Sequence, residues 1–273
     1  MSSLAAKHEK LKHALARLES LIVAFSGGVD SALVLRVAHD VLGANVLAVT
    51  ADSPAVPRRE MAAARRIARS IGARHRVLST TELEDRNYAA NPVNRCYFCK
   101  SELYSRLAEV AKRENIRYIA NGTNVDDLGD YRPGLQAAAE YQVVSPLKDA
   151  GFSKADVREL AKRLGLEIWD KPASPCLASR IPYGQPVTRE KLAAVERAEA
   201  YLHDLGIREL RVRHFGSKAR IETHARDFSV IAQNYDALAT RFQTLGFEAI
   251  ELAEFRSGAL NVGLGQPCQS SKP

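Results

Sequence analysis

The chain has 273 residues, 46% of them hydrophobic, and a formal net charge of +7. This length allows two domains at about 150 residues each. It contains no run of about 18 apolar residues, which excludes a membrane-spanning helix, and the lysines near its N-terminus are not typical of a signal peptide. We therefore expect a soluble, cytoplasmic protein with no membrane partner.

The first predicted elements surround a glycine-rich stretch. An amphipathic helix over residues 4–19 leads into an apolar strand over residues 21–25, and a helix follows over residues 32–38. Between strand and helix lies the sequence Ser26-Gly27-Gly28-Val29-Asp30-Ser31. Two glycines let the backbone approach an anion, and the N–H groups and dipole of the new helix favour negative charge. This stretch predicts a phosphate site.

Side chains within this stretch extend the prediction. Ser26 and Ser31 supply neutral donors, and Asp30 is placed to hold a divalent cation on the phosphates. The Gly-Lys-Ser/Thr ending of a Walker loop is missing, and the glycine spacing does not fit the dinucleotide fingerprint. Neither common nucleotide motif applies.

A second strand over residues 45–50 is followed by Ser53, and ligands bind at the carboxyl ends of such strands. Ser53 is thus either a neighbour of the nucleotide or part of an ordinary turn. The next predicted helix, residues 58–71, holds the densest basic patch of the chain. Because no aromatic residues are interleaved there, we interpret it as a solvated face, and nucleic acid is not an expected partner.

A third strand over residues 74–78, a helix over residues 97–113 and a fourth strand over residues 117–120 complete the alternation. Gly122 and Thr123 follow that last strand, and three carboxylates come next that either bind a metal or cap local turns, namely Asp126, Asp127 and Asp130. This order predicts an α/β fold with a mostly parallel sheet covered on both faces, over residues 1–186.

The end of this domain, residues 171–184, has three prolines and no periodicity, and a loop of this length is usually functional. Thr188 is the predicted N-cap of a helix that extends to Leu205. Strands over residues 209–215 and 218–223, a helix over residues 228–245 and a strand over residues 247–252 then form a small α+β domain, residues 187–265. Residues 266–273 are predicted to be a disordered tail.

The cysteines indicate a metal or redox site. Cys96 and Cys99 form a C-x-x-C pair, and Cys176 lies in the irregular loop. If the three converge, they suit a [4Fe-4S] cluster with one open iron. Zinc completed by water or histidine is the second interpretation, and three free thiols are the third. The fourth cysteine, Cys268, is treated as incidental.

The Ser26–Ser31 stretch resembles the pyrophosphate loop of the PP-loop ATP pyrophosphatases. In that group ATP is cut between its α and β phosphates and a substrate oxygen is adenylated. Gly122 and Thr123 match the loop that closes over the adenosine side of ATP. The resemblance implies that ATP and Mg²⁺ bind at Ser26, Gly27, Gly28, Asp30, Ser31, Ser53, Gly122 and Thr123.

More of the chain resembles the LarE family, the sulfur transferases of nickel-pincer nucleotide synthesis. The similarity includes residues 121–134, 172–180, 212–214 and 219–222. It implies that ATP adenylates a carboxylate of pyridinium-3,5-biscarboxylic acid mononucleotide, and that a sulfur nucleophile then displaces AMP to leave a thiocarboxylate. Asp30 and Cys176 would be the catalytic residues.

Two sulfur sources occur in this family. Either the cysteine at the position of Cys176 gives up its own sulfur, or three cysteines hold a cluster whose open iron carries an extra sulfide. The presence of Cys96 and Cys99 favours the cluster.

The substrate phosphate requires cations. Arg211 and Arg213 alternate along one strand and so point the same way, which suits anion capture, and the family similarity includes Arg213. Arg180 is a second candidate, and Glu222 would orient an arginine or the substrate.

Three rival functions share parts of this pattern. A tRNA thiolase uses the same loop but usually adds an RNA-binding or zinc-knuckle module. An ammonia-dependent amide-forming synthetase needs an ammonia source, and none is visible. A nucleotide sensor would leave Asp30 and the cysteines unexplained. The expected partners are a small-molecule nucleotide, further copies of the chain in a homo-oligomer, and a downstream nickel-insertion protein.

Overall fold

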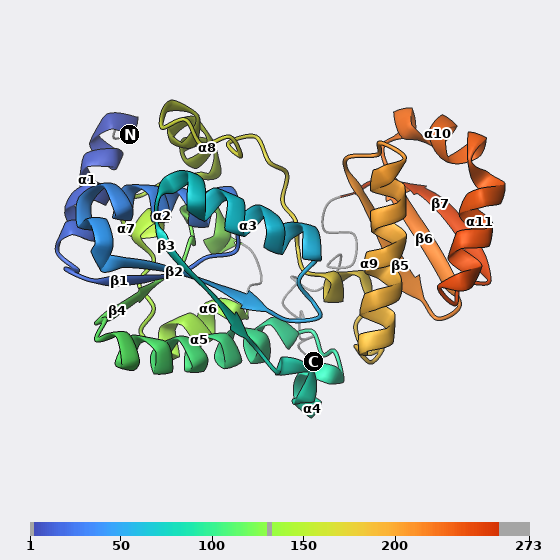
Figure 1. The fold of residues 1–273 in the computed structure, drawn as a ribbon, viewed down its shortest axis with the longest axis horizontal. Helices are drawn as coiled ribbons and strands as arrows, with labels where there is room; N and C mark the ends of the chain where they lie inside the picture. Colours follow the sequence, from blue (N-terminus) through green and yellow to red (C-terminus); the bar gives the residue numbers. More distant parts are fainter. Residues whose placement is uncertain (1–2, 130–132, 257–273) are drawn as a thin grey trace, which may run out of the picture. The chain divides into compact units, whose positions relative to one another are not determined.

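The computed structural model describes residues 3–129 and 133–256, which form two compact units (Figure 1). Unit 1 contains residues 3–85 and 94–174, and unit 2 contains residues 86–93 and 175–256. The predicted first domain covers residues 1–186, whereas in the structure the division falls after Ser174 and unit 2 also includes residues 86–93. Residues 257–265 and the predicted disordered tail, residues 266–273, lie outside the described residues.

Unit 1 is built on a four-stranded parallel sheet with the order β3-β2-β1-β4. Its strands are β1 (Leu21–Ala24), β2 (Val46–Asp52), β3 (Arg74–Ser79) and β4 (Tyr118–Ala120). Its helices are α1 (Leu4–Ala16), α2 (Val29–Leu42), α3 (Arg58–Ile71), α5 (Arg95–Glu114), α6 (Gly134–Glu140), α7 (Pro146–Asp149) and α8 (Lys154–Arg163), with short 3₁₀ turns η1 (Gly43–Asn45), η2 (Glu82–Glu84) and η3 (Val125–Gly129).

Helices cover both faces of this sheet (Figure 1). Leu21 and Val23 of β1 pack into one cluster with α1, α2, α3, α7 and α8, while Ile22 packs into the other with α5 and α6. All three side chains are fully buried, which is why this strand reads as a continuous apolar run. The predicted α/β fold is confirmed.

Unit 2 is a small α+β unit. Its strands are β5 (Leu210–Phe215), β6 (Lys218–Thr223) and β7 (Ala249–Glu254), with β5 antiparallel and β7 parallel to β6. Its helical segments are α4 (Arg86–Ala89), η4 (Leu177–Arg180), α9 (Arg189–Asp204), η5 (Ala225–Asp227), α10 (Phe228–Gln233) and α11 (Tyr235–Thr244). The predicted helix over residues 228–245 is therefore two helices, separated at Asn234.

The core of unit 2 joins α9, α10 and α11 to one face of its sheet through residues such as Leu202, Val212 and Phe242. Thr188 accepts a hydrogen bond from the Lys191 N–H at 3.3 Å, so the predicted N-cap of α9 is confirmed. The other face of the sheet carries Arg211, Arg213 and Glu222, because side chains alternate along a strand.

In the described part of the chain, no helix combines the length and the apolar character that crossing a membrane requires.

Candidate functional site

The glycine-rich stretch lies where the strand order of unit 1 reverses. β1 pairs with β2 on one side and with β4 on the other. The connections that follow β1 and β4 therefore leave the sheet in opposite directions. Ligands of open parallel sheets bind at such a point. The Ser26–Ser31 and Asn121–Asn124 segments both start at these carboxyl ends.

Contacts within the glycine-rich stretch hold its turn, since the Ser26 N–H donates to the Ser31 hydroxyl and the Gly28 N–H to the Ser26 hydroxyl, both at 3.3 Å. Gly27 has φ +73°, and a Cβ there would lie 3.0 Å from the Ala64 Cβ, so a larger residue is both strained and obstructed. The Ser26 and Ser31 hydroxyls are 3.2 Å apart, and Ser31 donates to the Gly28 carbonyl at 3.1 Å. The turn is thus rigid before α2 begins, with the dipole of that helix behind it.

Gly122 approaches the same turn from the end of β4. A Cβ at this position would lie 2.7 Å from the Ser31 nitrogen. The Asn121 Oδ1 atom accepts hydrogen bonds from the Thr123 N–H and the Ser145 hydroxyl, both at 3.0 Å. The structure therefore brings Gly122 against the first turn of α2, and ATP binding at Gly122 and Thr123 stays a prediction.

Asp30, in the first turn of α2, is held by two groups. The Asn124 Nδ2 group donates to its Oδ1 atom at 3.1 Å, and the Lys154 ammonium donates to its Oδ2 atom. Asp126 accepts from the Lys154 backbone N–H at 2.8 Å and Asp127 from the Asn124 N–H at 3.0 Å. Asp127 thus caps its own turn, Asp126 binds the first N–H of α8 (Lys154–Arg163), and Asp130 lies outside the described residues.

Two lysines beside the turn were missed by sequence reasoning. Lys154 meets Asp30, and the Lys171 ammonium donates to the Gly27 carbonyl at 3.3 Å and to Glu60 Oε2 at 2.6 Å. Neither lies in a recognisable motif near the turn, so their contacts could be found only from the fold. Both place an ammonium group where a polyphosphate would need charge neutralisation.

Ser53 follows β2 directly and is buried. Its hydroxyl accepts from the Ala55 N–H at 3.1 Å, and its carbonyl accepts from Arg58 at 2.6 Å. These contacts make Ser53 part of a local turn, the second of its two predicted roles.

The cysteines divide between the units. Cys96 and Cys99 lie in the first turns of α5 in unit 1, three residues apart and hence on one helix face, where the helix dipole favours thiolates. Cys176 directly precedes η4 in unit 2. Among the described residues, no group of three or more His, Cys, Asp or Glu side chains is gathered to hold a metal. The C-x-x-C pair fits as two thiolate ligands, and the three-cysteine set stays a prediction.

The Cys176 turn is anchored by a buried ion pair. Arg180 donates to both carboxylate oxygens of Glu199, at 2.8 and 3.1 Å, and to the Pro175 carbonyl at 2.7 Å. It also reaches the Cys176 carbonyl at 3.3 Å, and Glu199 accepts from the Val212 N–H of β5 at 3.0 Å. Arg180 therefore connects the cysteine turn, helix α9 and strand β5.

A second buried ion pair joins β5 to β6. Arg213 donates to Glu222 Oε2 at 2.9 and 3.0 Å and to the Ser179 carbonyl at 2.7 Å. Only 2% of Arg213 and 5% of Glu222 is exposed, so this pair also fixes the turn after Cys176 to the sheet. Glu222 orients an arginine, one of its two predicted roles.

Arg211 differs from these two arginines. It is 9% exposed and its guanidinium stacks 4.8 Å from the Phe255 ring, with no carboxylate bound to it among the described residues. Burial, followed by the positive charges of Arg213 and Arg180, lowers the pKa of Arg211. Three guanidinium groups thus share two carboxylates, which leaves this surface with an excess positive charge.

Comparison with known proteins agrees with this arrangement. Residues 20–91, which include the glycine turn, match the family model of the queuosine biosynthesis protein QueC. An uncharacterized protein of Synechocystis is 45% identical over 94% of this chain and 98% of its own length. A pyridinium-3,5-bisthiocarboxylic acid mononucleotide synthase of Lactiplantibacillus plantarum is 40% identical over 96% of both chains.

More distant similarity reaches other users of this domain. A tRNA-specific 2-thiouridylase of Xanthobacter autotrophicus is 32% identical over 64% of this chain and 55% of its own. The identity to the L. plantarum synthase, by contrast, extends through both units. The chain therefore belongs to the LarE family, that of pyridinium-3,5-bisthiocarboxylic acid mononucleotide synthase, whose members are ATP-using enzymes built on a PP-loop domain.

Proposed function

We propose that this protein is an ATP-dependent sulfur transferase that converts a carboxylate of pyridinium-3,5-biscarboxylic acid mononucleotide into a thiocarboxylate. The family membership supports this assignment, because the L. plantarum relative is named for the bisthiocarboxylic acid product. A carboxylate is a poor electrophile, and adenylation converts one of its oxygens into a leaving group.

Unit 1 carries the ATP half of the proposal. The glycine turn and the N-terminus of α2 receive the pyrophosphate part of ATP, with Lys154 and Lys171 as neighbouring cations. Asp30 would hold Mg²⁺, whose chemistry is to neutralise the phosphate charge. The Lys154 ammonium now bound to Asp30 is then free to donate to a phosphate oxygen.

Unit 2 carries the sulfur half. Cys176 begins a turn that two buried arginines hold against the sheet. Because Arg180 and Arg213 are already paired with carboxylates, Arg211 is the guanidinium with capacity for the substrate phosphate, and the other two define the surface on which it sits. This excess of one guanidinium beside the Cys176 turn is the observation that carries the proposal.

The sulfur source follows from the cysteine count. Cys96, Cys99 and Cys176 would hold a [4Fe-4S] cluster, which supplies a transferable sulfide when bound. The alternative route uses the Cys176 sulfur itself and leaves dehydroalanine. A cytoplasmic homo-oligomer that passes its product to a nickel-insertion protein completes the proposal.

The first experiment is anaerobic purification of the wild type, Cys96→Ala and the control Cys268→Ala, with iron and acid-labile sulfide assayed. About four irons per chain, lost in Cys96→Ala and kept in Cys268→Ala, support the cluster. Absence of iron, with a mass loss at Cys176 after incubation with ATP and substrate, assigns the sacrificial route instead.

Product analysis tests the function itself. The wild type should release AMP and pyrophosphate and form the thiocarboxylate, whereas Cys176→Ala should still release pyrophosphate as the carboxylate is adenylated but should form no thiocarboxylate. Release of AMP only with tRNA and a sulfur donor, or only with ammonia, would contradict the proposal in favour of a thiolase or an amide-forming synthetase.

A further inference from the structure

The Gly27 carbonyl is held from outside the glycine-rich stretch. The Lys171 ammonium donates to this carbonyl at 3.3 Å and to Glu60 Oε2 at 2.6 Å. Both members of the ion pair are largely buried, since 20% of the Lys171 side chain and 15% of the Glu60 side chain are exposed. The pair therefore connects the turn to helix α3 and to the segment that follows α8.

Both members of this pair are themselves anchored. Helix α3 packs against the turn at Ala64, because a Cβ on Gly27 would lie 3.0 Å from the Ala64 Cβ. Glu60 lies four residues earlier in α3, on the same helix face. The Lys171 backbone is fixed by Arg158 of α8, which donates to its carbonyl at 3.1 Å. The ammonium group thus has a defined position at the turn.

Holding the Gly27 carbonyl also fixes the Gly28 N–H. The two groups belong to one planar peptide and point in opposite directions. Because glycine has no Cβ, a peptide between two glycines can rotate with little steric cost, and rotation exchanges the positions of the carbonyl and the N–H. Lys171 opposes this rotation, since an ammonium group has only donors and binds the carbonyl but not the N–H.

We propose that Lys171 and Glu60 are positioning residues that keep the Gly28 N–H on the side of the turn that receives the pyrophosphate part of ATP. This inference rests on the proposed function. The Gly28 N–H donates to the Ser26 hydroxyl at 3.3 Å, which is long for such a bond, and an anionic oxygen is a stronger acceptor. Lys171 acts through the peptide, and Glu60 acts through Lys171.

Binding of inorganic pyrophosphate to the full chain, measured by calorimetry at constant ionic strength, tests this inference. Glu60→Gln is informative because charge and position predict opposite results. Loss of a negative charge by itself should tighten the binding of an anion, whereas loss of the Lys171 position should weaken it. We expect the dissociation constant to rise at least about tenfold, the scale of one hydrogen bond to a charged group.

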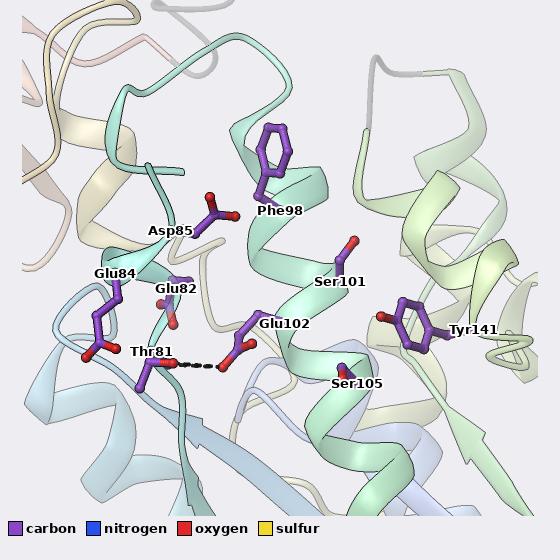
Figure 2. Close-up of a pocket in the computed structure, with 9 residues that line it drawn as sticks. All are labelled: Thr81, Glu82, Glu84, Asp85, Phe98, Ser101, Glu102, Ser105 and Tyr141. Atoms are coloured by element: carbon purple, nitrogen blue, oxygen red, sulfur yellow. Dashed lines mark hydrogen bonds between the residues drawn. The ribbon is translucent and has the colours of Figure 1, made fainter. Parts of the chain in front are cut away.

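Glu102→Gln is the matched control. Figure 2 shows Glu102 on helix α5, where the Thr81 hydroxyl donates to it, beside a cavity that no residue of the Ser26–Ser31 stretch lines. Its carboxylate also pairs with Arg106, and its side chain is 25% exposed, so it resembles Glu60 in partner and burial. Pyrophosphate binding should be unchanged in this variant.

The double variant Glu60→Gln/Lys171→Met guards against misfolding. It keeps the net charge and leaves neither member of the pair buried alone, so it should fold. Charge by itself predicts pyrophosphate binding as strong as in the wild type, whereas we expect it to be at least about tenfold weaker. The amide ¹H and ¹⁵N resonances of Gly28 should shift when pyrophosphate is added to the wild type, and less in the double variant.

Wild-type affinity in the double variant, or unchanged or tighter binding in Glu60→Gln, would overturn the inference and leave the proposed function intact. A wild type that binds neither pyrophosphate nor ATP would contradict the proposed function, and the inference with it.

Discussion

The two units offer positive potential to an anion in different ways. Under the proposed function, unit 1 would use the N–H groups and the dipole at the start of α2, beside the Gly27-Gly28 turn. Unit 2 uses buried guanidinium groups on one face of a sheet, of which Arg180 and Arg213 each need a carboxylate to remain there. A backbone site depends on the conformation of six consecutive residues, whereas a guanidinium site depends on partners brought together by the fold. The free energy of unfolding should therefore change little when a charged side chain of the site in unit 1 is removed. It should fall strongly when a buried carboxylate of unit 2 is removed.

Asp30→Asn gives the largest expected effect on activity. Removing the charge that would hold the cation should lower AMP release at least about 100-fold, the scale of losing one electrostatic group at a reaction centre. Because Lys154 and Asp30 are 36% and 24% exposed, the free energy of unfolding should change by no more than about 1 kcal/mol. If urea denaturation shows that Asp30→Asn lowers the free energy of unfolding by several kcal/mol, the two units do not differ in how their stability depends on charged side chains.

Glu199→Ala should give the largest expected loss of stability. It leaves Arg180 buried without its partner and costs about 3–5 kcal/mol of unfolding free energy, measured by urea denaturation. Glu159→Ala, which breaks an exposed pair with Arg163, is the control and should cost less than about 1 kcal/mol. The double variant Arg180→Met/Glu199→Leu removes the unpaired charge and should recover part of the stability, since the Val212 N–H and the Pro175 carbonyl still lose their partners. No recovery at all would show that the unpaired charge is not the source of the loss.

Gly122→Ala tests close approach in unit 1. Its Cβ would lie 2.7 Å from the Ser31 nitrogen, so the backbone must shift, at a cost of about 1–3 kcal/mol. Gly129→Ala in η3 is the matched control, because no atom lies within 4 Å of its Cβ position. We expect weaker ATP binding by calorimetry in the first variant alone. Equal ATP affinity in both would show that this approach does not shape the ATP site.

Arg211→Gln separates binding from stability in unit 2. Because Arg211 has no bound carboxylate, its removal should not lower the melting temperature, yet the KM for the mononucleotide should rise about tenfold, or 1.4 kcal/mol. Arg208→Gln, an exposed position before β5, should leave both quantities unchanged. If Arg211→Gln leaves the KM for the mononucleotide unchanged, another residue binds the substrate phosphate.

Acidification should give the smallest effect. Burial, and then Lys191, lowers the pKa of His214 in unit 2, and burial, and then Arg65, lowers that of His75 in unit 1. Between the lowered folded pKa and the unfolded value near 6.5, the unfolded chain binds more protons, so stability falls as pH falls below about 6.5. His214→Gln should reduce the difference in melting temperature between pH 7.5 and 5.5. An unchanged difference would mean that other groups carry the acid sensitivity.

Much of the fold was predictable because its signals are local. The apolar run of β1, the two glycines and the start of α2 lie within about twenty residues, and the strand ends of a parallel sheet necessarily meet at one edge. The boundary after Ser174 was not predicted, since it depends on contacts between distant segments. The division of the helix at Asn234 was missed although its contacts are local, the Asn234 amide donating to the Val230 carbonyl at 2.8 Å.

The sequence by itself determined the glycine turn before α2, because glycine conformation and helix start are properties of neighbouring residues. Only the tertiary structure decided how the charges pair. Lys154 and Lys171 reach Asp30 and Gly27 across 124 and 144 residues, and Arg180 reaches Glu199 across 19. The sequence pattern of an arginine on a strand is the same whether its side chain binds a ligand or a carboxylate of the protein. In the structure Arg180 and Arg213 are paired with buried carboxylates, whereas Arg211 stacks on Phe255, and its role with an anion stays a proposal.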